Sequence, residues 1–210
     1  MILSSRFDAS LAGSTWVGTV EAEFENAAVA VPAEKGYRLT LLRPGRDMVP
    51  FGAEVSFYRP PRVGDYIEVT FDGAPVDLTV PGDPGPVLDC PMYLLDSVGL
   101  GPGLTPAGDD RVVGALAAAT RFVAPWLDEF RRAVADLPRD CTTPVSREML
   151  DHAVAGRFPE ALRDYVAALG DLWMPPRELR VRQNRLITRI GATSGREMLK
   201  GVEAVVGSLP

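Results

Sequence analysis

The hydrophobic pattern of this chain changes its period once, near residues 81–90, and this change limits the folds that the chain can adopt. Before it, apolar and polar residues alternate, as they do in strands with one buried face. After it, apolar residues recur every three or four positions, as they do in amphipathic helices. Strands followed by helices predict an α+β protein.

The alternation is clearest in five stretches of the first part. They are residues 16–24, 27–31, 37–41, 67–71 and 76–80. The Asp-Gly pair at 72–73 is typical of a tight turn between two strands. The pattern predicts an antiparallel sheet or barrel over about residues 12–90, within a β subdomain that spans residues 1–90.

Six apolar stripes with helical spacing follow in residues 91–210, which we expect to form a helical subdomain. They begin at Val112, Leu127, Ser146, Leu162, Glu178 and Met198, and the last one runs to Leu209. The third helix is expected to start with Thr143 as N-cap and Pro144 at its first position. Ser194 and Glu197 have the spacing of a capping box for the last helix. The Pro/Gly-rich seam at residues 81–86 is short, so the two halves are expected to pack as one unit.

Composition and charge exclude some functions. The chain has 210 residues, 46% of them hydrophobic, and a net charge of −6. The acidic balance argues against binding to nucleic acid, although a local cluster of arginines could still bind a small anion. The N-terminus has no signal-peptide pattern and no apolar run reaches ~18 residues, so we expect a cytoplasmic protein without a membrane span.

The cysteines and the histidine do not form a recognisable site. Cys90 and Cys141 lie far apart, and His152 is the only histidine, whereas a zinc site needs about four ligands. We expect two buried free thiols in a reducing compartment. A catalytic Cys–His pair would need His152 as its base, and a lone histidine on an apolar helix is more often a structural partner of the backbone.

The strongest functional signal is the loop at residues 99–110, Gly-Leu-Gly-Pro-Gly-Leu-Thr-Pro-Ala-Gly-Asp-Asp. Four glycines and two prolines indicate an unusual, fixed backbone shape, and a helix follows at once. Glycine loops that lead into a helix bind anions, because free N–H groups and the helix dipole both favour negative charge. The loop ends in Gly-Asp-Asp where a Walker A motif has Gly-Lys-Ser/Thr, which disfavours an NTPase. The strands before it are expected to be antiparallel, whereas a dinucleotide site needs a parallel βαβ unit, so this motif is only weakly matched.

Asp109 and Asp110 allow two interpretations. In the first, the two carboxylates cap the helix and favour its dipole, a contribution of ~1 kcal/mol. In the second, they bind an N–H-rich group, hold Mg²⁺ or move a proton. A phosphate beside two carboxylates would need a metal bridge, or a place on the glycine side of the loop with an arginine.

Two further segments are candidate walls of the same pocket. The first is Ile190-Gly191-Ala192-Thr193-Ser194-Gly195, which opens the last helix, and the second is Thr142-Thr143-Pro144-Val145-Ser146. By itself each is a helix start, but two glycine loops raise the expectation that both line one pocket. Among the arginines, Arg196 is the best placed to bind an anion, because it lies in the first turn of the last helix.

Taken in order, these motifs resemble one family. The glycine loop, the Thr-Thr-x-x-Ser helix with Gly156-Arg157-Phe158 near its end, and Ile-Gly-x-Thr-Ser-Gly-x-x-Met-Leu-x-Gly are similar to the AllH family over about residues 87–207. The first motif is highly specific. The N-terminal half is similar to the family only in style.

The resemblance implies a subunit of oxamate carbamoyltransferase, which works with partner subunits. The implied reaction moves a carbamoyl group between oxalurate and phosphate and yields oxamate and carbamoyl phosphate. On this basis the two loops would hold phosphate or the oxamate carboxylate, and Asp109 or Asp110 would accept hydrogen bonds from the carbamoyl NH₂. The residues expected to bind substrate are Gly101, Gly103, Leu104, Thr105, Gly108, Thr143, Ser146, Gly191, Thr193, Ser194, Gly195 and Arg196.

The sequence also departs from the family pattern. Ala107 stands where the family often has Ser, Arg111 where an apolar or aromatic residue is usual, and Ala192 where a His is frequent. Two alternatives therefore stay open beside the transferase. One is a non-catalytic ligand-binding or regulatory subunit, because the site shows no obvious nucleophile. The other is a metal-dependent hydrolase that uses Asp109 and Asp110, with Mg²⁺ as a possible cofactor.

Overall fold

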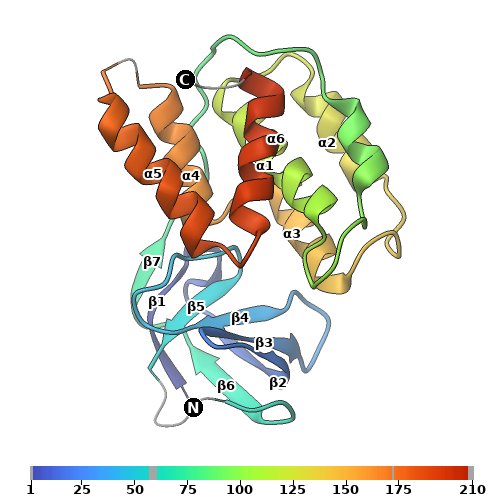
Figure 1. Cartoon of the computed structure of the whole chain (residues 1–210). Helices are drawn as coiled ribbons and strands as arrows, with labels where there is room; N and C mark the ends of the chain where they lie inside the picture. The colour runs from blue at the N-terminus through green and yellow to red at the C-terminus, as the bar shows by residue number, and fades with distance from the viewer. Residues whose placement is uncertain (1, 57–60, 172, 208–210) are drawn as a thin grey trace. The chain divides into compact units, whose positions relative to one another are not determined.

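The computed structural model describes residues 2–56, 61–171 and 173–207 of the chain. The chain divides into two units, Met1–Leu78 and Thr79–Pro210. Strands make up the first unit and helices the second (Figure 1). The α+β class is therefore confirmed.

The described strands of the first unit form one sheet of seven, in the order β5-β4-β3-β2-β6-β1-β7. Their bounds are β1 Ile2–Asp8, β2 Thr15–Glu23, β3 Ala27–Pro32, β4 Leu39–Leu42, β5 Gly52–Val55, β6 Tyr66–Thr70 and β7 Ala74–Val76. An additional pairing joins β5 to β1, so strands β1 to β6 close into a barrel and β7 continues the sheet beside β1. Closure leaves these six strands without a free edge.

Strand directions in the barrel are mixed. The pairs β1–β5, β2–β3, β2–β6 and β3–β4 are antiparallel, as the alternation suggested. The pairs β1–β6, β1–β7 and β4–β5 are parallel. Alternation reports that a strand has one buried face, and it carries no information on the direction of the neighbouring strand.

The alternation does not predict strands β1 and β5, and it predicts a strand at residues 76–80 that is too long. In β1 the burial pattern does not alternate, and β5 is buried at all four positions although it contains Glu54. The stretch at residues 76–80 ends its strand at Val76, and Thr79 forms an isolated bridge with Arg157 instead. Phe24 is 47% exposed because β2 ends at Glu23 after a register shift.

Inward-facing side chains of several strands fill the barrel. The buried cluster consists of Phe7, Leu11, Trp16, Val20, Ala28, Ala30, Leu39, Leu41, Ala53, Val55, Ile67, Val69 and Phe71. Its members include alternate residues of β2, β3, β4 and β6, so the period-two pattern located this core correctly.

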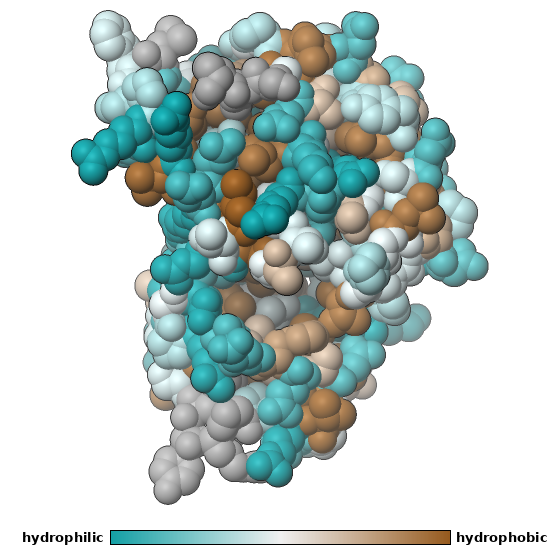
Figure 2. Space-filling view, viewed as in Figure 1, coloured by the Kyte–Doolittle hydropathy of each residue, from teal (hydrophilic) through white to brown (hydrophobic). Residues whose placement is uncertain are grey.

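The second unit contains α1 Ala107–Arg121, α2 Leu127–Ala135, α3 Pro144–Val154, α4 Glu160–Leu169, α5 Pro176–Arg189 and α6 Ser194–Val206. A short 3₁₀ helix, η2, spans Met92–Ser97 before them. Each α-helix matches one of the predicted stripes, except that Leu209 lies outside the described residues. On the face seen in Figure 2, hydrophilic residues are interspersed with smaller hydrophobic areas over this unit.

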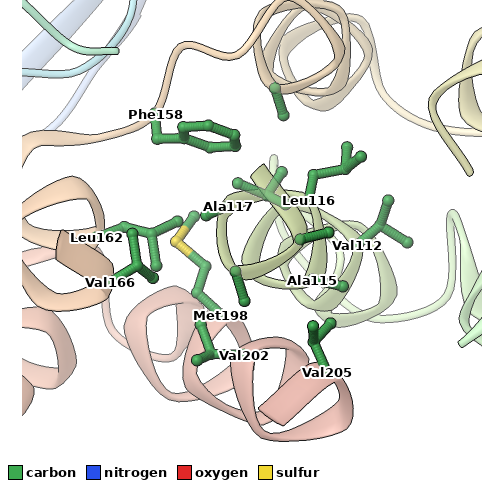
Figure 3. Packing of buried hydrophobic residues seen from close by; sticks show 14 of the residues in the cluster. Val112, Ala115, Leu116, Ala117, Phe158, Leu162, Val166, Met198, Val202 and Val205 are labelled. Carbon is green, nitrogen blue, oxygen red and sulfur yellow. The ribbon is translucent and has the colours of Figure 1, made fainter. Parts of the chain in front are cut away.

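Helix α1 is the centre of the helical core. Val112, Leu116 and Ala119 are fully buried, and Figure 3 shows the first two in the cluster that also contains Phe158, Met198 and Val202. The neighbouring side chains come from helices far apart in the sequence. The core therefore holds these helices against α1.

Glycines bring α1 and α6 into unusually close contact. A Cβ on Gly114 would lie 1.9 Å from the carbonyl oxygen of Met198, and a Cβ on Gly201 would lie 1.9 Å from that of Arg111. Only a residue without a side chain fits at either position. The contact keeps α6 directly against α1, and it thereby determines which groups of α6 can approach the start of α1.

We expect Gly201→Ala to lower the free energy of unfolding by about 1–3 kcal/mol, because the added methyl group overlaps the backbone of α1. The loss should occur although alanine favours a helix over glycine by ~1 kcal/mol. Urea unfolding of the variant measures it. Gly36→Ala is the control, because a Cβ there meets no atom closer than 3.8 Å. Equal stability of Gly201→Ala and wild type would contradict the close contact.

Candidate functional site

The glycine loop has the unusual backbone shape that its composition predicts. Gly99, Gly101 and Gly103 have φ angles of +78°, +130° and +95°. A Cβ on Gly99 would lie 2.0 Å from the carbonyl oxygen of Cys141, so this end of the loop lies against the segment before α3. A Cβ on Gly103 would meet no other part of the chain within 4 Å, so the middle of the loop is open.

Some N–H groups at the start of α1 already have acceptors within the chain. Gly108 N–H donates to the carbonyl of Leu100, and the N–H groups of Asp109 and Asp110 both donate to the carbonyl of Pro106. A Cβ on Gly108 would lie 1.8 Å from the Ser97 oxygen, so Gly108 serves close packing of the backbone. The first turn of α1 is therefore not the open set of donors that the sequence suggested.

Free donors lie instead in the loop before the helix. Within the described chain, the N–H groups of Gly101, Gly103, Leu104 and Thr105 have no hydrogen-bond acceptor. Residues 101–104 are exposed and Thr105 is half-buried. These N–H groups can donate hydrogen bonds to a ligand oxygen.

Asp109 holds the loop to α3. Its Oδ1 accepts a hydrogen bond from Gly99 N–H at 2.6 Å, and its Oδ2 accepts from the hydroxyls of Thr142 and Ser146. The side chain is buried, with 1% of its surface exposed. One carboxylate thus ties together α1, the first residue of the loop and the start of α3.

The start of α3 contributes a second connection to the loop. Thr143 is the N-cap, as predicted, and its Oγ1 accepts the N–H of Ser146 at 3.1 Å. The same hydroxyl donates to the carbonyl of Leu104. Thr143 and Ser146 therefore shape the site, and both use their hydroxyls within the chain.

The carboxyl of Asp110 differs from that of Asp109 in its hydrogen bonding. Its side chain is 0% exposed, and no described group forms a hydrogen bond with either carboxyl oxygen. The hydroxyls of Thr105 and Ser194, which are hydrogen-bonded to each other at 3.0 Å, lie close enough to lower the pKa of Asp110, although neither makes a hydrogen bond of normal geometry with its carboxyl oxygens. An unpartnered buried carboxyl is unusual, because burial of a polar group without a partner costs free energy.

The surroundings of Asp110 favour its neutral form. Burial raises the pKa of Asp110 to about 7, and the negative charges of Asp109 and Glu197 act in the same direction. The hydroxyls of Ser194 and Thr105 oppose this shift without cancelling it. A carboxyl with such a pKa can hold or release a proton near neutral pH.

Glu197 belongs to an ion-pair group on the α6 side. Arg111 Nε donates to it at 2.6 Å and Lys200 Nζ at 2.7 Å. Burial raises the pKa of Glu197, but the hydrogen bonds from Lys200 and Arg111 outweigh burial and lower it overall. Arg111, at a position where the sequence resemblance predicts an apolar or aromatic residue, therefore holds this carboxylate beside α1.

The predicted capping box at Ser194 and Glu197 is wrong. The N-cap of α6 is Thr193, whose side chain makes no capping hydrogen bond. The Ser194 hydroxyl pairs with Thr105, and Glu197 pairs with Arg111 and Lys200. Contacts with α1 and its loop have replaced the local cap that the spacing suggested.

The remaining predicted residues lie around α6. Gly191 has a φ angle of +53°, and a Cβ on Gly195 would lie 2.0 Å from the carbonyl of Leu186, so Gly195 packs α6 on α5. In the described chain, the N–H groups of residues 191–194 have no acceptor. Arg196 is exposed and forms no ion pair with a described residue.

Neither the cysteines nor the histidine forms a hydrogen bond with the carboxyl group of Asp110. Cys90 and Cys141 are free thiols and are half-buried. Burial, with the charge of Asp109 next, raises the pKa of the Cys141 thiol, which disfavours the reactive thiolate. His152 is buried, and its Nδ1 lies 2.6 Å from the Arg157 guanidinium; since arginine only donates, Nδ1 is the acceptor.

In the described residues, no group of three or more His, Cys, Asp or Glu side chains is arranged to hold a metal ion. A search of the same residues finds no helix that is long and apolar enough to cross a membrane.

Some site residues escaped the sequence interpretation. Gly99, Thr142 and Glu197 take part through contacts with residues at least ten positions away in the chain. Thr142 and Gly99 lay inside the motifs and could have been found there. Glu197 could not, because its spacing to Ser194 pointed to a helix cap.

Comparison with protein-family models matches residues 97–206 to the family described as oxamate carbamoyltransferase subunit AllH. The match covers more than half of the chain, from the end of η2 to the last residue of α6. It therefore contains the whole site described above. Searches of curated proteins and of solved structures gave no match.

We expect Asp109→Ala to lower the free energy of unfolding by about 2–5 kcal/mol, because three donors lose their acceptor at a buried position. Asp109→Asn should cost clearly less, since its amide oxygen can still accept the Gly99 N–H and its NH₂ can donate to a hydroxyl. Chemical denaturation of both variants measures the difference. Equal losses would contradict the role of Asp109 as an acceptor for all three donors.

The stability of the folded chain should depend on pH through the carboxyl of Asp110. The carboxyl of an unfolded chain loses its proton near pH 4, whereas Asp110 in the folded chain keeps it until about pH 7. The folded state therefore binds more protons in this range, and its stability falls as pH rises through it.

Asp110→Asn does not titrate, so its stability relative to wild type should rise from about pH 4 to about pH 7, by up to about 4 kcal/mol, and then stay level. Taking the difference between the variant and wild type at each pH cancels the contribution of Glu197 and the other titrating groups to the stability. Thermal or urea unfolding over this range measures the difference. A difference that is constant with pH would show that Asp110 has an ordinary pKa.

Proposed function

The chain belongs to the AllH family, and from this premise we propose that it acts in an oxamate carbamoyltransferase that moves a carbamoyl group between oxalurate and phosphate. The family description names a subunit, so partner subunits are part of the proposal. The products in the forward direction are oxamate and carbamoyl phosphate. All of these compounds are small anions.

One observation supports a reaction at this site more than any other. The starts of α1 and α6 meet at the Thr105–Ser194 hydrogen bond, and the unpartnered carboxyl of Asp110 lies beside that pair. Free N–H groups of residues 103–105 and 191–194 lie in the two segments that lead into these helices. The site thus offers donors for an anion and one carboxyl with no other partner.

The residues divide into positioning and binding roles. The loop is held to α3 by the hydrogen bonds of Asp109, Thr143 and Ser146. These three residues therefore position the loop. The N–H groups of the two loops are suited to phosphate or to the carboxylate of oxamate. Arg196 is exposed one turn into α6 and can supply a positive charge.

Donors around the carbamoyl carbon would also serve the chemical step. When a phosphate oxygen attacks that carbon, negative charge develops on the carbamoyl oxygen. N–H groups and hydroxyls that are already oriented stabilise such charge, and loss of one donor typically reduces turnover by about 10²–10³.

The test is the phosphate-dependent cleavage of oxalurate by the chain assembled with its partner subunits. Thr105→Val removes one hydroxyl of the pair with little change in shape, and we expect it to lower turnover about tenfold or more. Thr188→Val is the control, because Thr188 is exposed on α5 and its hydroxyl bonds only the carbonyl of Asn184. It should leave turnover unchanged.

A second role is a ligand-binding subunit without catalysis. It is favoured by one observation: within the described residues no histidine, lysine or cysteine forms a hydrogen bond with Asp110. On this alternative Thr105→Val would weaken anion binding but leave the turnover of the complex intact. Absence of any phosphate-dependent cleavage of oxalurate by the assembled complex would reject the transferase.

A further inference from the structure

Asp110 has properties that neither capping nor packing requires. It is the fourth residue of α1, it lies fully inside the unit, and its two oxygens have no partner among the described groups. The hydrogen bonds that hold the loop to α3 are made by Asp109 and Thr143, and none of them involves Asp110. A valine or leucine would fill the same position without the cost of burying an unpaired carboxyl.

Charged groups that face Asp110 all favour a carboxyl that keeps its proton. From its own helix it faces Asp109, and from α6 it faces Glu197. The cations of this region, Arg111 and Lys200, are already paired with Glu197. Thr105 and Ser194 supply hydroxyls and no charge.

A neutral carboxyl offers two hydrogen-bonding groups side by side. Its O–H donates and its C=O accepts, whereas a carboxylate only accepts. A carbamoyl group offers the complement in the same spacing, because its C=O accepts and its N–H donates. Together they form a ring closed by two parallel hydrogen bonds.

We propose that Asp110 binds the carbamoyl group of the substrate as a neutral acid, donating its O–H to the carbamoyl oxygen and accepting one carbamoyl N–H on its own carbonyl oxygen. This inference rests on the proposed function and names the group that recognises the transferred unit. To reach Asp110, the ligand breaks the hydrogen bond between the hydroxyls of Thr105 and Ser194. Each of these hydroxyls is then free to donate to the rest of the substrate.

These two hydrogen bonds assist carbamoyl transfer, and the protonation state of Asp110 is the same before and after the reaction. An oxygen of hydrogen phosphate attacks the carbamoyl carbon, and the C=O electron pair moves to the oxygen that accepts the O–H of Asp110. That pair returns as the bond from carbon to the oxalurate nitrogen breaks. The proton of hydrogen phosphate ends on this nitrogen and gives oxamate, while Asp110 keeps its own proton.

The geometry also explains selectivity for carbamoyl over acyl groups. In an acetyl-type analogue a methyl group replaces NH₂, so the carbonyl oxygen of Asp110 would be left buried without a donor. A binding site that leaves a buried polar group unpaired discriminates strongly against such an analogue.

The experiment compares carbamoyl phosphate, which carries the transferred group, with acetyl phosphate, which has the same phosphate and carbonyl but a methyl group in place of NH₂. Isothermal titration of the full chain measures both affinities in wild type, Asp110→Asn and Asp110→Leu. Asparagine keeps one donor and one acceptor side by side, while leucine has a similar size and neither. Unfolding curves verify that each variant is folded.

We expect wild type near pH 6 and Asp110→Asn to bind carbamoyl phosphate roughly tenfold or more tightly than acetyl phosphate. Asp110→Leu should bind the two nearly equally. In wild type the preference should decline above about pH 7, as Asp110 loses its proton, at most about tenfold per pH unit. In Asp110→Asn it should not depend on pH, because the two ligands carry the same phosphate group and a change in its charge affects both alike.

Two results would overturn this inference while leaving the transferase proposal in place, provided that the assembled complex still cleaves oxalurate with phosphate. One is a preference for carbamoyl phosphate that persists in Asp110→Leu, which would place recognition elsewhere. The other is a wild-type preference that grows as pH rises and is lost in Asp110→Asn, which would make Asp110 a carboxylate acceptor. No binding of carbamoyl phosphate together with no cleavage by the complex would reject both proposals.

Discussion

A buried carboxylate that accepts three hydrogen bonds keeps the glycine loop in place. Asp109 joins Gly99, Thr142 and Ser146, which come from the loop and from the start of α3. Charge-assisted hydrogen bonds of this kind are stronger than neutral ones, and each donor left behind at a buried site would cost free energy. The shape of the loop follows from this latch together with the positive φ angles of its glycines.

The adjacent carboxyl has a different environment because of a contact on the other side of α1. Gly114 and Gly201 let α6 approach the backbone of α1, and Ser194 and Glu197 of α6 come to face Asp110. Thus two consecutive aspartates differ in environment: Asp109 accepts three hydrogen bonds, and the buried carboxyl of Asp110 accepts none from the described residues. Environment, more than residue type, decides which carboxyl can hold a proton near neutral pH.

Much of the fold follows from the period of the hydrophobic pattern, since a buried face repeats every two residues in a strand and every three or four in a helix. All six α-helices and the core positions of β2, β3, β4 and β6 were found in this way. Strands β1 and β5 were missed because neither alternates in burial. The parallel pairings could not be predicted, because strand direction depends on connections that the local pattern does not record.

The site was predictable where its signal is local. The glycine loop and the N-cap at Thr143 could be recognised from the sequence alone. The capping box at Ser194 was wrong because a contact with Thr105, 89 residues away, uses the hydroxyl instead. For the same reason the difference between Asp109 and Asp110 could not be read from two identical adjacent residues.

The most direct test is a ¹³C NMR titration of the aspartate carboxyl carbons in the folded chain, with the Asp110 signal assigned from Asp110→Asn. Our account predicts that this carboxyl loses its proton near neutral pH, in keeping with the pKa of about 7 that its burial produces. An Asp110 signal that titrates near pH 4, as in an unfolded chain, would contradict it. Asp110 would then be a carboxylate throughout the physiological range and could not donate a hydrogen bond to a substrate.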